Sequence, residues 1–440
     1  MIDDGLRFPP GFAFGAATAA YQIEGAVDAD GRGPSVWDTF AHTPGAVAHG
    51  HTGDVACDSY HRYGEDVRLL SGLGVQSYRF SVSWPRVLPT GGGAVNQAGL
   101  DYYRRLVDAL REAGIEPAAT LFHWDLPQQL QDAGGWLSRD TAARFADYAG
   151  VLAEALGDRV GRWITLNEPV VVTWNGHVEG SHAPGLKLGL GAFPVVHHQL
   201  LGHGLAVAAL RAATPGVPVG ITNNYGPCRP ATGAAEDVAA AQLQDALHNQ
   251  LYTDPVLLGR YPEAVRELAA GTADDLPVIS APIDFLGVNY YFPELVRADP
   301  DTVFGTAPVP WPDAPRTAFD WPVVPSGLTD TLTWLRDRYP GLPPVYITEN
   351  GAAYDDAVGP DGAVHDPDRV AYLDTHLRAV RAAIDAGVAV RGYYCWSLLD
   401  NFEWAEGFSK RFGLVHVDFD TLARTPKDSY RWFRDLVAAQ

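Results

Sequence analysis

The stretches WITLNEP (residues 163–169) and VYITENG (residues 345–351) each end an apolar run with a glutamate at a turn. Short apolar runs with β-branched residues are typical of buried strands. Pro169 biases Glu168 toward extended geometry, and the Asn-Gly pair after Glu349 is a strong turn signal. Both acids are therefore expected at strand ends, where barrel enzymes keep their reactive groups.

The rest of the chain repeats the same unit, a strand followed by an amphipathic stretch. Strands are predicted at residues 12–16, 77–84, 116–123, 163–168, 219–225, 285–291, 345–349 and 392–397. Helices are predicted at residues 60–73, 99–113, 139–156, 195–213, 238–259, 326–339, 368–386 and 429–439. Eight such units favour an α/β fold, a (β/α)8 TIM barrel. A doubly wound open sheet is the alternative, but no glycine-rich phosphate turn follows an early strand.

No low-complexity linker or charge run divides the chain, so residues 1–440 are expected to form one catalytic domain. Two stretches rich in glycine and proline, residues 176–191 and 298–325, are expected to be long irregular loops. Long loops inside compact domains tend to be functional. We expect both to border the face where the strands end.

Charge and cysteine content narrow the possible partners and the compartment. The 53 acidic and 32 basic residues give a formal net charge of −21, which disfavours nucleic acid and anionic membranes as partners. The three cysteines, Cys57, Cys228 and Cys395, are far apart and show no zinc spacing, so free thiols in a reducing compartment are expected. No signal peptide or membrane-spanning run is visible, so the chain is expected to be cytoplasmic.

The predicted strand at residues 77–84 alternates apolar and polar side chains. In a barrel its apolar set should face the helices, which leaves Arg79 inside the lumen. A buried guanidinium needs a carboxylate, and Glu349 is the candidate, because this contact would keep the carboxyl ionised. A structural Arg–Asp bridge elsewhere is the alternative.

Polar and aromatic side chains also stand at the ends of other predicted strands. The strand ends supply Gln22, His123, Asn167, Glu403 and Trp404, which together offer hydroxyl-binding groups and a stacking surface. Each alone is more often structural than functional, but their convergence predicts a sugar pocket. Two facing carboxyls, Glu168 and Glu349, are the minimum equipment for cleaving a glycosidic bond in such a pocket.

The chain resembles glycoside hydrolase family 1, most closely its bacterial β-glucosidases, over nearly its whole length. The resemblance rests on residues 12–25 (FAFGAATAAYQIEG), 57–63 (CDSYHRY), 165–169 (TLNEP), 347–351 (ITENG) and 396–404 (WSLLDNFEW). The strings around the two glutamates are short, but they occur in this order and together with the other three strings. This combination makes the resemblance specific.

This resemblance implies roles for individual residues. Glu168 would be the acid/base and Glu349 the nucleophile of a retaining double displacement. Three residues, Arg79, Asn289 and Tyr291, would support them. The substrate-binding set would be Gln22, His123, Trp124, Asn167, Trp396, Glu403, Trp404 and Phe412. On the aglycone side, Trp321 matches a family tryptophan, and His177 stands where an aromatic residue is common.

The expected activity is hydrolysis of terminal non-reducing β-D-glucosyl residues from cellobiose, cello-oligosaccharides and aryl or alkyl β-glucosides, with side activity on β-galactosides and β-fucosides. No metal or cofactor is expected, because carboxylates do the work, and the oligomeric state is left open. The preferred glycone also stays open between glucose, galactose and fucose. Two other classes of protein are the alternatives. A silent sugar-binding barrel should lack one glutamate, and an aldolase needs a strand-end lysine, whereas Lys187, Lys410 and Lys427 lie in loops or at a helix start.

Overall fold

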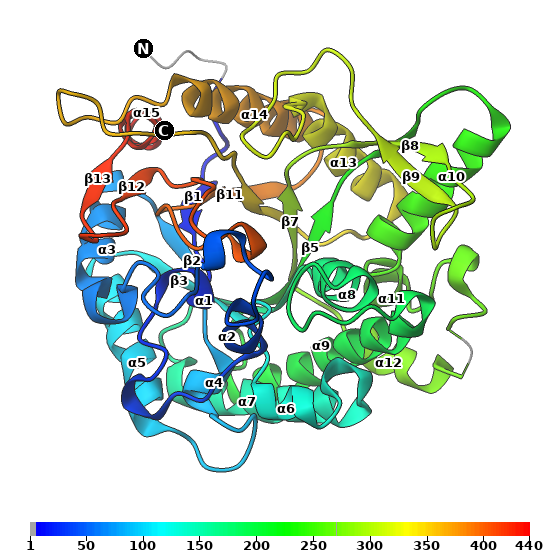
Figure 1. Ribbon diagram of the computed structural model, residues 1–440, viewed down its shortest axis with the longest axis horizontal. Coiled ribbons are helices and arrows are strands. Elements are labelled where there is room, and N and C mark those ends of the chain that lie inside the picture. The colour runs from blue at the N-terminus through cyan, green and yellow to red at the C-terminus, as the bar shows by residue number, and fades with distance from the viewer. Residues whose placement is uncertain (1–5, 270) are drawn as a thin grey trace.

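The computed structural model describes residues 6–269 and 271–440, and its centre is a closed barrel of parallel strands (Figure 1). The strands neighbour one another in the order β1-β11-β10-β7-β5-β4-β3-β2, so β1 pairs with both β2 and β11. Their bounds are β1 Ala13–Ala17, β2 Ser77–Ser81, β3 Glu116–Phe122, β4 Arg162–Asn167, β5 Val219–Tyr225, β7 Phe285–Tyr290, β10 Val345–Asn350 and β11 Val390–Trp396. The predicted (β/α)8 barrel is confirmed.

Long helices follow the barrel strands and surround the barrel (Figure 1). They are α3 Ser59–Leu73, α5 Gln97–Glu112, α7 Arg139–Leu156, α9 Phe193–Ala213, α13 Pro325–Arg338, α14 Pro367–Asp385 and α15 Asp428–Ala438. Helix α7 shows why they pack inward, since Ala142, Phe145, Ala149 and Leu152 recur at helical spacing and are buried. None of the helices in the described residues combines the length and the apolarity needed to cross a membrane.

Further helices, most of them short, occupy the connections. The α-helical ones are α1 Ala20–Ile23, α2 Val36–Ala41, α4 Trp84–Val87, α6 Gln128–Asp132, α8 Pro169–Thr173, α10 Ala235–Asp245, α11 Asp254–Leu258 and α12 Leu276–Ile279. Single turns of 3-10 helix are η2 Ala29–Gly31, η3 Ala48–Gly50, η4 Gly135–Leu137, η6 Gly189–Ala192, η8 Glu263–Val265, η9 Ala273–Asp275 and η10 Trp404–Glu406. Two π-helical turns, η5 Trp174–Glu179 and η7 Ala246–Gln250, complete the set. The stretch 176–191, predicted to be irregular, therefore contains part of a π-turn and a 3-10 turn.

Two small sheets lie outside the barrel and were not predicted. Strands β6 Cys228–Pro230, β8 Glu294–Ala298 and β9 Thr306–Val309 form one, and β12 Val415–Val417 pairs with β13 Arg424–Pro426 in the other. Figure 1 shows β8, β9 and α10 together at one edge of the molecule. The prediction that residues 298–325 are irregular is therefore wrong in part, because β9 pairs antiparallel with β8.

The helix predicted at residues 238–259 is in fact interrupted. Helix α10 ends at Asp245, the π-turn η7 follows, and α11 begins at Asp254. Pro255 lies in the first turn of α11, where its missing N–H costs nothing. The same proline could not lie in the interior of a continuous helix without losing a hydrogen bond. The interruption brings η7 next to the end of β5.

Candidate active site

A cavity of about 340 Å³ lies at the carboxyl ends of the barrel strands. Ten residues selected from the sequence line it: His123, Trp124, Glu168, Tyr291, Trp321, Glu349, Trp396, Glu403, Trp404 and Phe412. Four more of the predicted set, Gln22, Arg79, Asn167 and Asn289, are buried behind its wall and contact residues that line it. The structure thus brings nearly the whole predicted set to one place.

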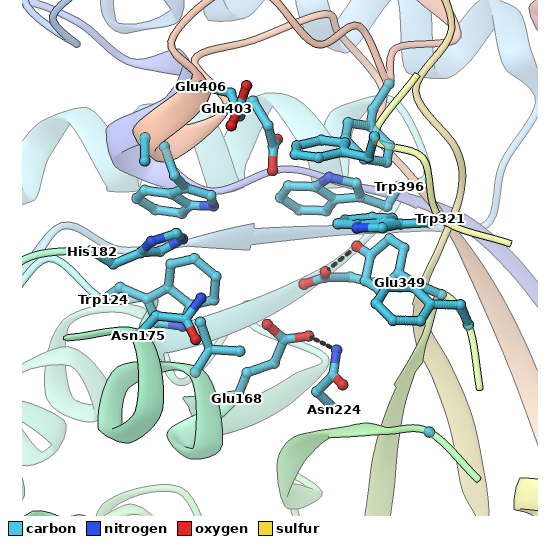
Figure 2. Close-up of a pocket in the computed structure, with 18 of the residues that line it drawn as sticks. Trp124, Glu168, Asn175, His182, Asn224, Trp321, Glu349, Trp396, Glu403 and Glu406 are labelled. Carbon is cyan, nitrogen blue, oxygen red and sulfur yellow. Dashed lines mark hydrogen bonds between the residues drawn. The ribbon is translucent and has the colours of Figure 1, made fainter. Parts of the chain in front are cut away.

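Glu168 and Glu349 enter this cavity from different strands. Glu168 directly follows β4, and Glu349 lies at the end of β10. Figure 2 shows their side chains extending into the same space, with Glu403 entering from the opposite wall. Both are nearly inaccessible to solvent, at 4% exposure for Glu168 and 3% for Glu349. Two buried carboxyls in one cavity are the arrangement expected for glycoside cleavage.

The backbone of Glu168 differs from the sequence prediction. We expected an extended residue before Pro169, but its φ is 47° and its ψ is 62°, in the left-handed region. β4 therefore ends at Asn167, and Glu168 is the N-cap of α8. The proline disfavours the right-handed helical region for the preceding residue, yet the left-handed region stays open to it. Such residues are uncommon and cluster at functional sites.

The backbone around Glu349 is irregular too. The pairing of β10 with β7 shifts register between Ile347 and Glu349, which marks a bulge. Bulges re-aim side chains beside active sites. Gly351 follows, and a Cβ there would lie 1.8 Å from the carbonyl oxygen of Trp396. Only glycine fits this turn, so the Asn-Gly signal has a steric cause.

Glu349 has the partners that favour an anion. Arg79 Nη1 donates to its Oε1 at 2.6 Å, and the Tyr291 hydroxyl donates to its Oε2 at 2.7 Å. The pairing expected between Arg79 and Glu349 is therefore present. Burial raises the pKa of Glu349, and Arg79 and Tyr291 oppose that rise.

Glu168 has neutral partners instead. The side-chain amides of Asn224 and Asn289 both donate to its Oε1, at 2.9 and 2.8 Å. Burial, and next the charge of Glu349, raise the pKa of Glu168 to about 8. At neutral pH this carboxyl therefore holds a proton.

A hydrogen-bonded layer beneath the cavity connects the two glutamates. Arg79 also donates to the Asn167 side-chain oxygen at 2.6 Å, and Asn289 donates to the same oxygen at 3.1 Å. The Asn167 amide in turn pairs with His123 Nε2 at 3.0 Å. Burial, then the charge of Arg79, lowers the pKa of His123 well below its usual value, so the ring is neutral. The layer holds its members in single orientations.

Glu403 forms the opposite wall and keeps a proton of its own. Gln22 Nε2 donates to Glu403 Oε2 at 3.3 Å and to the Phe402 carbonyl at 2.9 Å. Burial, and next the charge of Glu349, raise the pKa of Glu403 to about 8. An amide and a carboxyl side by side can each bond a sugar hydroxyl.

Aromatic rings complete the wall. The His123 ring stacks against Trp396 and Trp404, with centroids 5.8 and 5.9 Å away, and Trp124 lies 4.4 Å from Trp404. On the other side, Trp321 stacks on Phe319 at 4.3 Å. Flat indole faces of this kind can cover the C–H face of a sugar.

His177 is the one predicted site residue that lies elsewhere. It is buried in the π-turn η5 and does not line the cavity, and its Nδ1 pairs with the Val172 carbonyl oxygen at 2.8 Å. The resemblance placed it on the aglycone side, because it stands where an aromatic residue is common in the family. A π-turn changes which side chains share a face, so helical spacing could not give its direction.

Sequence reasoning missed the other lining residues, which are Val171, Asn175, His182, Asn224, Gly226, His248, Phe292, Glu294, Phe319, Ala405 and Glu406. Asn224 could have been found, because it stands near the end of β5 like the polar residues that were selected. His248 gave no comparable signal, since it lies in a turn that the sequence did not reveal. Within residues 6–269 and 271–440, no group of three or more His, Cys, Asp or Glu side chains is arranged to hold a metal ion.

A parallel barrel that carries two buried carboxyls in one aromatic-lined cavity defines a class of enzyme, the glycoside hydrolases. Residues 5–440 match the model of glycosyl hydrolase family 1, and the chain belongs to this family. It is 48% identical to beta-glucosidase A of Acetivibrio thermocellus, with 98% of each chain covered. It is also 48% identical to the bifunctional beta-D-glucosidase/beta-D-fucosidase of Bifidobacterium breve, again over 98% of both.

Solved structures agree with this assignment. The beta-glucosidase from Thermotoga maritima in complex with glucoimidazole superimposes with a TM-score of 0.96 at 49% identity. The match covers 98% of this chain and 99% of that one. The fold is thus that of the family over the full barrel, and the protein is a glycoside hydrolase.

Proposed function

We propose that the protein is a retaining β-glucosidase that removes terminal non-reducing β-D-glucosyl residues from cellobiose, cello-oligosaccharides and aryl or alkyl β-glucosides. Side activity on β-fucosides and β-galactosides is included, and the bifunctional relative supports the fucoside part. One observation carries the proposal. Two buried carboxyls share a cavity, and Glu349 has an arginine partner whereas Glu168 has only amides.

In the first step, a Glu349 oxygen attacks the anomeric carbon while the bond to the leaving oxygen breaks. Glu168 gives its proton to that oxygen, and the products are a glycosyl ester on Glu349, a free alcohol and a Glu168 carboxylate. The pKa of about 8 supports the acid role, because Glu168 is protonated at neutral pH. The contacts from Arg79 and Tyr291 support the nucleophile role, because they stabilise the anion.

In the second step, the Glu168 carboxylate takes a proton from a water molecule whose oxygen attacks the anomeric carbon. The ester bond breaks, Glu349 leaves as a carboxylate, and the sugar is released with its original configuration. Forming the ester removes the negative charge of Glu349. That charge is one of the causes of the high pKa of Glu168, so this pKa falls when the ester forms. The Glu168 carboxyl is therefore ionised in the second step, when a base is needed.

The remaining residues are proposed to bind the sugar. The set is Gln22, His123, Trp124, Asn167, Trp396, Glu403, Trp404 and Phe412, and the cavity contacts described above support it. Asn167 would hold the 2-hydroxyl, a contact that strengthens in the transition state. Trp321 is proposed on the leaving-group side. His177 is not kept there, because it does not line the cavity.

We further propose that the whole chain acts as one catalytic domain on small-molecule substrates in the cytoplasm. The closed barrel, in which β1 pairs with β11, supports one domain. Free cysteines, two of them buried, support a reducing compartment.

The nucleophile role is tested with Glu349→Ala. Hydrolysis of nitrophenyl β-glucoside should be abolished, because no glycosyl ester can form. Azide or formate should restore part of the turnover by occupying the space of the lost carboxylate. Full activity of this variant without an added anion would reject the role.

Sugar preference is tested with a panel of aryl β-glycosides that share one leaving group. Glucoside should give the highest kcat/KM, with fucoside and galactoside following. A preference for another hydroxyl pattern would contradict the proposed substrate but not the proposed mechanism. This measurement therefore tests the substrate separately from the mechanism.

A further inference from the structure

The two oxygens of the Glu168 carboxyl are in different surroundings. Oε1 accepts both amide donors, from Asn224 and Asn289. In the described part of the chain, Oε2 has no such donor. An oxygen that already accepts two N–H groups is a poor place for a proton, so the proton belongs on Oε2. The asymmetry therefore decides which oxygen faces the leaving group as an acid.

Each amide can support Glu168 only in one orientation, with its nitrogen toward the carboxyl. The Thr348 hydroxyl sets the Asn289 amide by donating to its oxygen at 2.7 Å. His248 occupies the equivalent place for Asn224, because its Nε2 lies 3.1 Å from the Asn224 side-chain oxygen. Since that oxygen can only accept, His248 must present an Nε2–H.

The surroundings of His248 favour this donation from its Nε2–H to Asn224. It lies in the π-turn η7, a type of turn that is frequent at functional sites, and it lines the cavity. Asp245 and Glu294 are the charged groups that face its ring. Burial lowers the pKa of His248 against the pull of these two carboxyls, so the ring is neutral and has one N–H to give.

We propose that His248 is a positioning residue for the acid/base step, which holds the Asn224 amide so that Oε1 of Glu168 is occupied and Oε2 carries the proton. This inference rests on the proposed function, in which Glu168 is the acid. His248 acts through Asn224 and touches neither glutamate in the described hydrogen bonds.

Loss of the His248 donor has a specific consequence. The Asn224 amide is free to turn, and its oxygen can then face Oε1, which becomes able to hold the proton. The carboxyl also loses a donor that stabilises its anion, so the pKa of Glu168 rises further. The charged groups around Glu168, namely Glu349, Arg79 and Glu403, stay in place.

The experiment compares His248→Leu with His248→Gln, whose side-chain amide can still donate to Asn224. Each variant is assayed with phenyl β-glucoside, whose poor leaving group needs a proton, and with 2,4-dinitrophenyl β-glucoside, which needs none. His248→Leu should lower kcat/KM for the phenyl substrate about tenfold, part of the ~10²–10⁴-fold worth of a general acid. The dinitrophenyl value should change less than about twofold by the same reasoning. The alkaline limb of the phenyl pH profile should move to higher pH, and His248→Gln should restore both properties.

A buried histidine away from the cavity provides the matched control. His376 is buried in α14, with Nδ1 2.8 Å from the Tyr372 carbonyl oxygen, so His376→Leu should show no dependence on leaving group. Asn224→Ala should reproduce the selective loss, and adding His248→Leu to it should cost nothing more. If His248→Leu folds poorly, Asn224→Ala and His248→Gln are compared instead, and only Asn224→Ala should show the selective loss.

Three results would overturn the inference: equal losses on both substrates, a His248→Gln variant as poor as His248→Leu, or additive losses with Asn224→Ala. Failure of the parent enzyme to cleave either glucoside would instead reject the proposed function. The two failures are thus distinguishable.

Discussion

Two buried groups of acidic and basic side chains differ in the balance of negative and positive charge. In the cavity, Glu168, Glu349 and Glu403 lie together, and within the described residues one cation, Arg79, contacts one of them, Glu349. The second group, here called the C-terminal anchor, consists of Asp356, Asp366, Asp400, Arg369, Arg411 and Lys427. In the anchor every carboxylate contacts at least one cation.

The pKa values follow this difference. Burial acts on both groups, but Lys427 and Arg411 outweigh it and hold the pKa of Asp400 below its usual value. In the cavity nothing comparable offsets burial, and the pKa values of Glu168 and Glu403 rise to about 8. Carboxylates that contact a cation hold segments of the chain together. Buried carboxyls that lack such a contact stay protonated, and that proton is available for acid catalysis.

The largest expected effect comes from neutralising the uncompensated acid. Glu168→Gln should lower kcat/KM for phenyl β-glucoside by about 10²–10⁴-fold, because the leaving oxygen receives no proton. The dinitrophenyl substrate should lose far less. Folding should not suffer, since an amide replaces an acid that is already protonated at neutral pH, and urea unfolding of the variant checks this. Equal losses on both substrates would contradict the acid role.

The anchor should show the reverse pattern, with loss of stability first. Lys427 Nζ contacts Asp400 at 2.7 Å and is 0% exposed. Lys427→Met leaves that carboxylate with less compensation and should lower the free energy of unfolding by about 3–5 kcal/mol, measured with urea. As a control, Arg431→Met breaks an exposed pair with Asp428 and should cost at most about 1 kcal/mol. Equal costs would mean that burial does not distinguish the two pairs.

Asp125 tests the same rule outside the cavity. It is fully buried, and burial raises its pKa to about 8. The folded protein keeps this proton, whereas the unfolded chain releases it near pH 4, so parent stability falls as pH rises from about 4 to 8. Asp125→Asn has no proton to lose. Its advantage in unfolding free energy should therefore grow between pH 5 and 7, with a slope of at most about 1.4 kcal/mol per pH unit. A pH-independent difference would show that Asp125 is ionised when folded.

The pH profile of the parent gives the mildest test. Above about pH 8 Glu168 loses its proton, so kcat/KM for a phenyl glucoside should fall about tenfold per pH unit. Glu403 titrates in the same range, so the limb belongs to the coupled group. The acid limb should lie above the usual glutamate range, because burial raises the pKa of Glu349. An alkaline limb below pH 6 would contradict the balance described for the cavity.

Elements with strong periodicity could be predicted from the sequence alone. Strand β5 and helix α7 have the same bounds as the predicted residues 219–225 and 139–156. The contact of Arg79 with Glu349 followed from alternation in one strand and the need of a buried cation for a partner. These inferences used short-range patterns and a single rule about buried charge.

Features that depend on backbone irregularity could not be predicted. The left-handed conformation of Glu168, the π-turn of His248 and the burial of His177 arise where local spacing rules fail. The strands of the small sheets are three to five residues long, and their pairing depends on distant segments. Sequence reasoning therefore predicted Glu168 and Glu349 as a pair, with Asn289 beside them, and missed Asn224 and His248.

The C-terminal anchor has a consequence for the newly made protein. Asp400 lies between β11 and Glu403, and its partner Lys427 stands at the start of α15. Strand β1 pairs with β11, so the barrel cannot close before β11 has been synthesised. The segment between β11 and Glu403 therefore gains its Lys427 contact only after residue 427 has been synthesised, so we expect a nascent chain shorter than this to be inactive.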